Sequence, residues 1–323
     1  MNFIDFKRND QFSSLSENDL KDLINKIENF DLVYRDSLGL SDDVSFGVEI
    51  EFEGTDEDLV DEYIEKNFKA WIMLGDTSLK SGGEVISPVL YDDIKTWKAL
   101  KDICNFLKEN NADTFHNAAG HIHIGAPILG ENIDNWKNFL KTYILYENIL
   151  FRFLYGDKIG PRKRITDFAE PISLYLYSNM DKILNSRNIY HLKEFLPSFD
   201  KKKAINFKNV MFYDINNFYK KNTIEFRSPN ATIEEVIWQN NINVLVKLLL
   251  SASKIDQDFL DYKLNKKMFV SDFDMYNKID LQTSLEFADL IFQNNLDKLY
   301  FLRQYIKNYE ESCLCISAKR FVR

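Results

Sequence analysis

The chain has 323 residues, of which 45% are hydrophobic and 14% aromatic, enough for the core of one large domain or two smaller ones. Its net charge of −9 argues against a non-specific nucleic-acid-binding surface, and three cysteines are too few for a secreted disulfide framework. The sequence shows neither a membrane-spanning apolar run nor a signal-peptide pattern. The composition therefore predicts a globular, cytoplasmic protein without nucleic acid or membrane among its partners.

The first predicted elements are a helix after Ser16 and a strand over residues 44–53. Ser16 is a favourable N-cap, and apolar residues with a 3.6-residue period follow it. In the strand, apolar and polar residues alternate, which places Glu49, Glu51 and Glu53 together on one face. These carboxylates would lie roughly 6.5–7 Å apart and repel one another unless water or a divalent cation separates them. For this stretch alone, a solvated sheet face is favoured over a metal site.

The next segment contains two predicted strands and a helix. Residues 70–74 are expected to form a buried strand, and a turn-rich loop over 75–83 follows it. Glu84 then begins a short strand that ends at a proline. Residues 92–109 have the pattern of an amphipathic helix, with Ile94 on its apolar face.

A second polar strand face is predicted over residues 117–125. His121 and His123 share one face of this strand, and isoleucines occupy the other. A single histidine is usually structural, but a pair on one face makes metal or ligand binding equally plausible. Residues 131–155 are expected to be helical, and the basic loop containing Arg162 and Arg164 is interpreted as a solvated turn rather than a phosphate or substrate contact.

The last predicted strands cover residues 204–212 and 222–230, after a helical stretch over 172–200. In the second strand Glu225 and Arg227 share a face, a pattern that is usually only an exposed ion pair. From residue 232 onward the sequence predicts helices that pack on the sheet.

Four strands thus each place ionisable groups on one face, and in one antiparallel sheet these faces would converge. A site rich in carboxylates, with few imidazoles and no thiolate, favours Mg²⁺ or Mn²⁺ over zinc. A guanidinium in the same site is suited to a phosphoryl group. The combination points to a site for a metal ion and a nucleotide.

The same motifs, in the same order, resemble those of the amidoligase family. They are Phe46-Gly-Val-Glu-Ile-Glu51, Asp76-Thr-Ser-Leu79, Gly83-Glu-Val-Ile-Ser-Pro88, Asn117-Ala-Ala-Gly-His-Ile-His123 and Thr223-Ile-Glu-Phe-Arg227. This family belongs to the carboxylate–amine ligase superfamily that includes glutamine synthetase and glutamate–cysteine ligase. The resemblance covers about residues 44–250.

The resemblance implies an α+β fold like the glutamine synthetase catalytic domain. Its twisted antiparallel sheet would carry the site on a concave face, with helices packed on the back. The expected organisation is an N-terminal helical extension over 1–40, a catalytic domain over 41–255 and a C-terminal helical part over 256–323 packed on the same domain. A helical insertion is expected over about 131–200.

The resemblance also implies roles for individual residues. Glu49 and Glu51 would bind two divalent ions, with Glu84 as a further ligand, and His121 would join Glu49 and Glu225 around the ion that orients the ATP phosphates. Arg227 and His123 would contact phosphate and, with Glu84, would be the catalytic residues. The residues expected near the carboxylate substrate are Asn117, Gly120, Arg162 and Arg164. No residue stands out as the base that deprotonates the amine.

The implied activity is ATP-dependent formation of an amide or peptide-type bond through an acyl phosphate, with Mg²⁺ or Mn²⁺. The substrates would be a small-molecule or peptide carboxylate and an amine, and the protein could be an oligomer. Two alternatives remain open, a metal-dependent hydrolase of amides or peptides and a non-catalytic nucleotide-binding module on the same fold.

Overall fold

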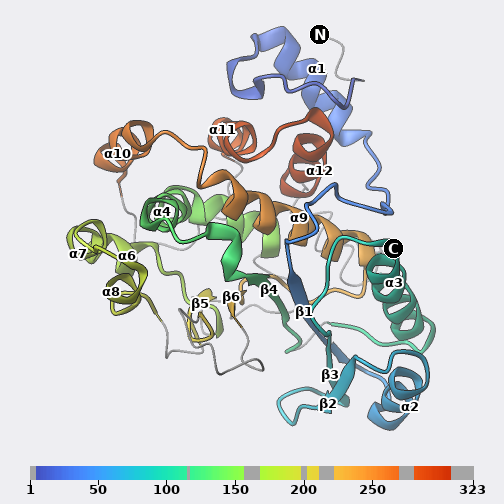
Figure 1. The fold of residues 1–323 in the computed structure, drawn as a ribbon. Coiled ribbons are helices and arrows are strands. Elements are labelled where there is room, and N and C mark those ends of the chain that lie inside the picture. Colours follow the sequence, from blue (N-terminus) through green and yellow to red (C-terminus); the bar gives the residue numbers. More distant parts are fainter. Residues whose placement is uncertain are drawn as a thin grey trace.

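A computed structural model describes residues 5–114, 117–155, 168–197, 202–210, 222–268 and 280–306. In these residues, helices surround a six-stranded antiparallel sheet (Figure 1). The strands, in sheet order, are β2 (Ile72–Gly75), β3 (Gly82–Ile86), β1 (Phe46–Glu53), β4 (Gly120–Gly125), β6 (Thr223–Phe226) and β5 (Ile205–Asn206). The predicted mixture of helices with an antiparallel sheet is confirmed, whereas the likeness to the glutamine synthetase catalytic domain stays a prediction.

One face of the sheet forms the hydrophobic core. In β1, Val48, Ile50 and Phe52 are fully buried on this face, as their alternation predicts. Helix α3 (Ile94–Glu109) covers the β1 end, where Trp97 stacks on Phe46 with ring centroids 5.4 Å apart. Helices α4 (Ile133–Tyr155) and α9 (Glu235–Ser251) cover the β4 and β6 end. The opposite face, with its polar side chains, is left for the site.

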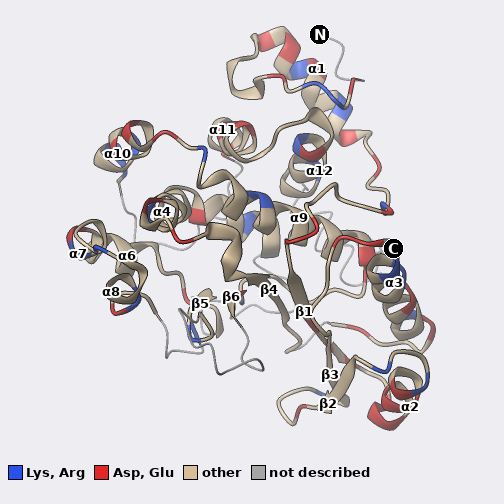
Figure 2. Ribbon diagram, in the orientation of Figure 1, with Lys and Arg blue, Asp and Glu red and all other residues tan. Residues whose placement is uncertain are grey.

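The remaining helices are mostly short and lie around this centre. The expected helix after Ser16 is confirmed, because the Ser16 hydroxyl accepts a hydrogen bond from the Asp19 amide at its first turn. Acidic residues are dense on α2, as Figure 2 shows. These helices are η1 (Phe12–Ser14), α1 (Glu17–Glu28), α2 (Glu57–Asn67), η2 (Ala126–Leu129), α6 (Ser173–Ser178), α7 (Met180–Leu184), α8 (Ile189–Lys193), α10 (Gln257–Lys266), α11 (Leu281–Ile291) and α12 (Asn295–Tyr305).

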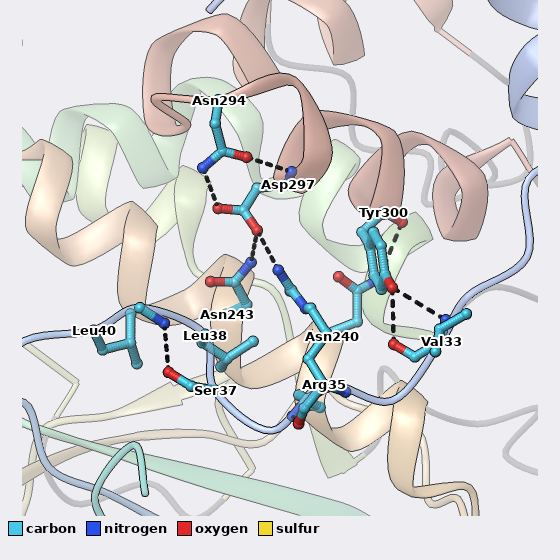
Figure 3. Close-up of polar contacts among 12 residues, drawn as sticks. Val33, Arg35, Ser37, Leu38, Leu40, Asn240, Asn243, Asn294, Asp297 and Tyr300 are labelled. Atoms are coloured by element: carbon cyan, nitrogen blue, oxygen red, sulfur yellow. Dashed lines mark hydrogen bonds and ion pairs between the residues drawn. The ribbon is translucent and has the colours of Figure 1, made fainter. Parts of the chain in front are cut away.

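Residues 30–43, which we call the N-terminal strap, join α1 to β1 without regular secondary structure. The strap crosses α9 and α12 (Figure 3). The Tyr300 hydroxyl bonds to both the amide and the carbonyl of Val33, at 3.1 and 2.8 Å. The Arg35 backbone makes a similar pair of bonds with the Gln239 side chain, and its guanidinium lies 2.9 Å from Asp297. The strap therefore ties the segment before β1 to α9 and α12.

At its far end the strap is fixed by Asp92, which precedes α3. The Asp92 carboxylate accepts hydrogen bonds from the amides of Leu38 and Leu40, each at 2.8 Å, and from the Trp97 indole at 2.6 Å. The strap thus connects α9 and α12 with α3, the helix that packs under β1. The predicted domain boundaries stay a prediction.

Two details of the predicted elements are wrong. The strand expected to be buried is the edge strand β2, where Ile72 and Leu74 are 56% and 49% exposed because only β3 pairs with it. Ile94 lies at the start of α3 and is 68% exposed rather than part of the apolar face. The stretch over 172–200, predicted to be helical, contains the three short helices α6, α7 and α8 in its described residues. No helix in the described ranges is both long and apolar enough to cross a membrane.

Candidate active site

The strand register brings the predicted polar residues of four strands onto one face of the sheet. Directly paired residues of antiparallel strands project to the same side, with their Cβ atoms about 4.5–5.5 Å apart. The pairs on the site face are Glu49 with His121, His123 with Glu225, and Glu51 with Glu84. The polar side chains of the four strands therefore converge because the strand register pairs them directly.

Glu49 lies at the centre of this face. One of its carboxylate oxygens accepts a hydrogen bond from His121 at 2.8 Å, and the other accepts one from His123, also at 2.8 Å. Glu49 belongs to two clusters of candidate metal ligands. Within each cluster, the ligand atoms all lie within 4.8 Å of one another. The first cluster is Glu49, His123 and Glu225, and the second cluster is Glu49, Glu84 and His121.

The carboxylates of the second cluster have opposite pKa shifts. Burial acts to raise the pKa of Glu49, but hydrogen bonds from His121 and His123, with their charge, outweigh it and hold that pKa well below its ordinary value. Burial and the neighbouring Glu49, followed by Glu51 and Asp76, raise the pKa of Glu84 to about 8. Glu84 thus lies among groups that disfavour its ionised form, and a cation bound beside it would have the opposite effect.

The donor atoms of both clusters fit a hard divalent cation. Each cluster offers two carboxylates and one imidazole without thiolate, a set that suits Mg²⁺ or Mn²⁺. The two histidines and Glu225 are only 6–7% exposed, so an ion bound there would be largely shielded from water. This grouping differs in one respect from the prediction, because His123 rather than His121 lies with Glu49 and Glu225.

Glu225 is held from two sides. Arg227 donates to one of its carboxylate oxygens, and the Asn206 side chain donates to the other at 3.0 Å. The Nε of Arg227 is buried and has no hydrogen-bond partner among the described residues. Arg227 thus retains a buried donor that an anionic ligand could use.

Glu51 lies beside the second cluster rather than in it. One of its oxygens accepts a hydrogen bond from the Ala119 amide at 2.6 Å, and the other lies 3.9 Å from His121 Nε2. The structure therefore shows a backbone contact for Glu51 together with a position next to a candidate ligand.

The residues expected near the carboxylate substrate have different positions. The Asn117 side chain is exposed and donates to the Ser78 carbonyl at 3.0 Å. Gly120 pairs with Ile50 and lies on the core face, where a Cβ atom would come within 2.8 Å of Trp238. Arg162 and Arg164 lie outside the described residues.

A pocket of about 410 Å³ opens beside the first cluster. Gly47 forms part of its wall, where a Cβ atom would approach the Ser87 hydroxyl to 3.3 Å. Ser87 is itself fixed, since it accepts a hydrogen bond from the Val48 amide and donates to the Pro88 carbonyl. The lining residues are Ser45, Phe46, Gly47, Val48, Glu49, Ile86, Ser87, Pro88, Val89, His123, Pro127, Asn222 and Thr223.

Asn206 and Ser87 were not among the predicted site residues. Asn206 lies between Ile205 and Phe207, so strand alternation alone would have placed it on the polar face. Ser87 had no comparable signal, because its contact with Val48 depends on the pairing of β1 with β3.

Comparison with known families gives a match over most of the strands of the site. A family model described as "Putative amidoligase enzyme" matches residues 73–249, from β2 through most of α9. Glu84, His121, His123 and Glu225 lie inside this span, and Glu49 lies before it. No curated protein matches the chain significantly.

Proposed function

This chain belongs to the amidoligase family, whose model spans more than half of its length, and from that premise we propose that it is an ATP-dependent ligase. It would join a carboxylate to an amine through an acyl phosphate, with the help of divalent metal ions. The observation that carries the proposal is the position of Glu49, which belongs to two candidate ligand clusters at once. Two adjacent cations with a shared carboxylate suit phosphoryl transfer.

The described residues suggest how the ions would be held. His123 and Glu225 would share one ion with Glu49, and Glu84 and His121 would share the other. When bound, the ions would neutralise charge on the phosphates during transfer. The raised pKa of Glu84 supports this role, because a nearby cation would favour the ionised form that crowding now disfavours.

The pocket next to the first cluster is the proposed place for the nucleoside part of ATP. Its volume of about 410 Å³ is in the range of small-ligand sites. Pro88, Val89 and Pro127 give it apolar walls, and Glu49 and His123 lie at its edge. A nucleoside in this pocket would direct its phosphates toward the ions and toward Arg227.

The proposed reaction has two steps. An oxygen of the substrate carboxylate attacks the γ-phosphorus, the bond to the β–γ bridging oxygen breaks, and ADP leaves. The amine nitrogen then attacks the carbonyl carbon of the acyl phosphate, loses a proton and expels inorganic phosphate. Arg227 would stabilise negative charge on the transferring group, and its guanidinium is already oriented by Glu225.

The test is ADP release from Mg-ATP by the purified protein, with and without a pool of amino acids and peptides. We expect pool-dependent ADP and a condensed product of matching mass. Glu49→Gln should abolish both, whereas Glu62→Gln, on the exposed side of α2, should leave them unchanged. Cleavage of amides or peptides without ATP, and without any ADP, would instead identify a hydrolase.

A further inference from the structure

Glu53, the third glutamate of β1, is buried, and the two candidate metal clusters give no reason for its burial. It is 1% exposed and belongs to neither cluster. One of its carboxylate oxygens accepts a hydrogen bond from the Lys80 amide at 3.0 Å, and the other accepts one from the Asn117 amide at 3.0 Å. Both oxygens are thus engaged with backbone N–H groups, which is the environment of a structural anchor rather than an open ligand.

These two amides belong to different segments that meet at this end of the site. Lys80 lies in the loop over residues 76–81 between β2 and β3, which we call the β2–β3 loop. Asn117 begins the stretch over residues 117–119 that leads into β4. A second contact joins the two segments directly, because the Asn117 side chain donates to the Ser78 carbonyl at 3.0 Å.

Close packing supports the same junction. Leu79 of the β2–β3 loop is buried against Ala118 and Ala231. Where the loop returns to the sheet, a Cβ atom on Gly82 would lie 1.9 Å from the Phe52 carbonyl oxygen, so only glycine fits against β1. The loop therefore cannot move away from β1 without breaking several contacts around Glu53.

The three glutamates of β1 contact successive residues of β4 and of the segment that leads into it. Glu49 accepts from the His121 side chain, Glu51 from the Ala119 amide and Glu53 from the Asn117 amide. The pocket proposed for the nucleoside lies at the opposite end of β1, around Gly47. The site thus has a nucleotide end and a second end bounded by the β2–β3 loop.

We propose that Glu53 is a positioning residue that holds the β2–β3 loop and residues 117–119 together as the wall for the carboxylate or amine substrate. The inference rests on the proposed ligase function, and it assigns the Glu53 end of the face to these substrates rather than to ATP. Asp76 belongs to the same loop and acts on Glu84 by its charge, which places the start of the loop near the second cluster.

The kinetic test compares Glu53→Gln with the Glu62→Gln control. The glutamine amide keeps the size of the side chain but turns an NH₂ group toward one of the two backbone donors. We expect the KM for the condensing substrate found in the pool to rise about tenfold, while the KM for ATP changes less than about twofold. A purely structural defect would lower the active fraction and therefore kcat, with both KM values unchanged. An equal rise in both KM values, or a loss confined to kcat, would overturn the proposal.

A second measurement does not depend on ligase activity. Amide hydrogen exchange should increase in the β2–β3 loop and in residues 117–119 of Glu53→Gln, while Mn²⁺ binding followed by electron paramagnetic resonance stays at the control level. Unchanged exchange, or loss of Mn²⁺ binding, would show that Glu53 does not act by holding these segments. If no substrate pool yields ADP with the unchanged protein, the ligase proposal fails, and this measurement still decides the role of Glu53 as an anchor.

Glu53→Asp keeps the charge and serves as the conservative variant. Its shorter side chain can still accept one backbone hydrogen bond, so we expect exchange and substrate KM between those of the unchanged protein and Glu53→Gln. It also provides a readout should Glu53→Gln fold poorly. Values for Glu53→Asp beyond those of Glu53→Gln would contradict the proposed anchor.

Discussion

Glu84 and Asp92 are close in the sequence but lie in opposite electrostatic surroundings. Glu84 faces other carboxylates across the sheet, and its pKa is raised to about 8 by burial and by Glu49. Asp92 receives hydrogen bonds from the strap amides and from Trp97, which outweigh its burial and lower its pKa. One carboxylate therefore stabilises the fold as an anion, and the other is ionised there only at a cost.

The contacts of the N-terminal strap extend this comparison. Asp297 is 2% exposed, but its oxygens are bound by Arg35, Asn243 and Asn294 (Figure 3). Burial of polar groups is thus common to both regions. The site differs from the strap because its carboxylates face one another instead of hydrogen-bond donors. A buried carboxylate that lies beside other carboxylates is therefore a better indication of a functional site than burial alone.

The largest expected effect is that of Glu49→Gln, which removes the ligand shared by both clusters. Loss of an outer-shell partner lowers metal affinity by up to about a hundredfold. Loss of a direct ligand should cost more, so Mn²⁺ affinity should fall by more than about a hundredfold. Isothermal titration with Mn²⁺ measures this change. Glu62→Gln is the matched control, and retained binding would show that Glu49 is not a ligand.

Asp297→Ala tests the strap, and we expect it to lower stability without changing Mn²⁺ affinity. The change leaves Arg35 partly buried without its carboxylate, so the free energy of unfolding should fall by about 3 kcal/mol. Urea unfolding measures the loss, and Asp22→Ala on the exposed side of α1 is the control. Mn²⁺ affinity of the folded protein should stay unchanged. A large loss of affinity would mean that strap and site are not separate.

The third prediction concerns pH and Glu84. Its pKa in the folded chain, about 8, lies above the ordinary 4.5, so the folded state binds a proton that the unfolded state releases. The free energy of unfolding of the metal-free protein should therefore fall as pH rises from about 4.5 to 8. Glu84→Gln should flatten this slope in urea titrations and weaken Mn²⁺ binding. An identical slope in the variant would remove Glu84 as its source.

Asp92→Asn should have the smallest effect, with the opposite pH dependence. The lowered pKa of Asp92 means that its stabilisation is present above its unfolded-state pKa and is lost as pH falls through the folded value. At neutral pH the variant should be less stable by about 1 kcal/mol, because the amide weakens several hydrogen bonds. Thermal unfolding at neutral and acidic pH should show the difference shrinking in acid. A constant difference would contradict the role of ionised Asp92.

Alternation within single strands was enough to predict which side chains share a face. It gave Glu49, Glu51 and Glu53 on one side of β1, and His121 and His123 on one side of β4. Period two is a local property of the backbone, so one sequence reveals it.

Pairing between strands could not be predicted in the same way. The register decides that His123, rather than His121, lies opposite Glu225, and the strand order decides that β2 is an exposed edge. The position of Gly120 depends on Trp238, far away in the sequence. These contacts depend on tertiary structure, which local patterns do not encode.

The strap also has a consequence for the order in which the molecule is made. Its partner Gln239 follows Arg35 by 204 residues, and Tyr300 follows Val33 by 267. During synthesis from the N-terminus, the strap can meet Asp92 early, but it must wait for most of the chain before it finds its contacts with α9 and α12. Closing so long a loop is slow, and a chain arrested before α12 would expose a strap that lacks its partners Asp297 and Tyr300 to chaperones and proteases.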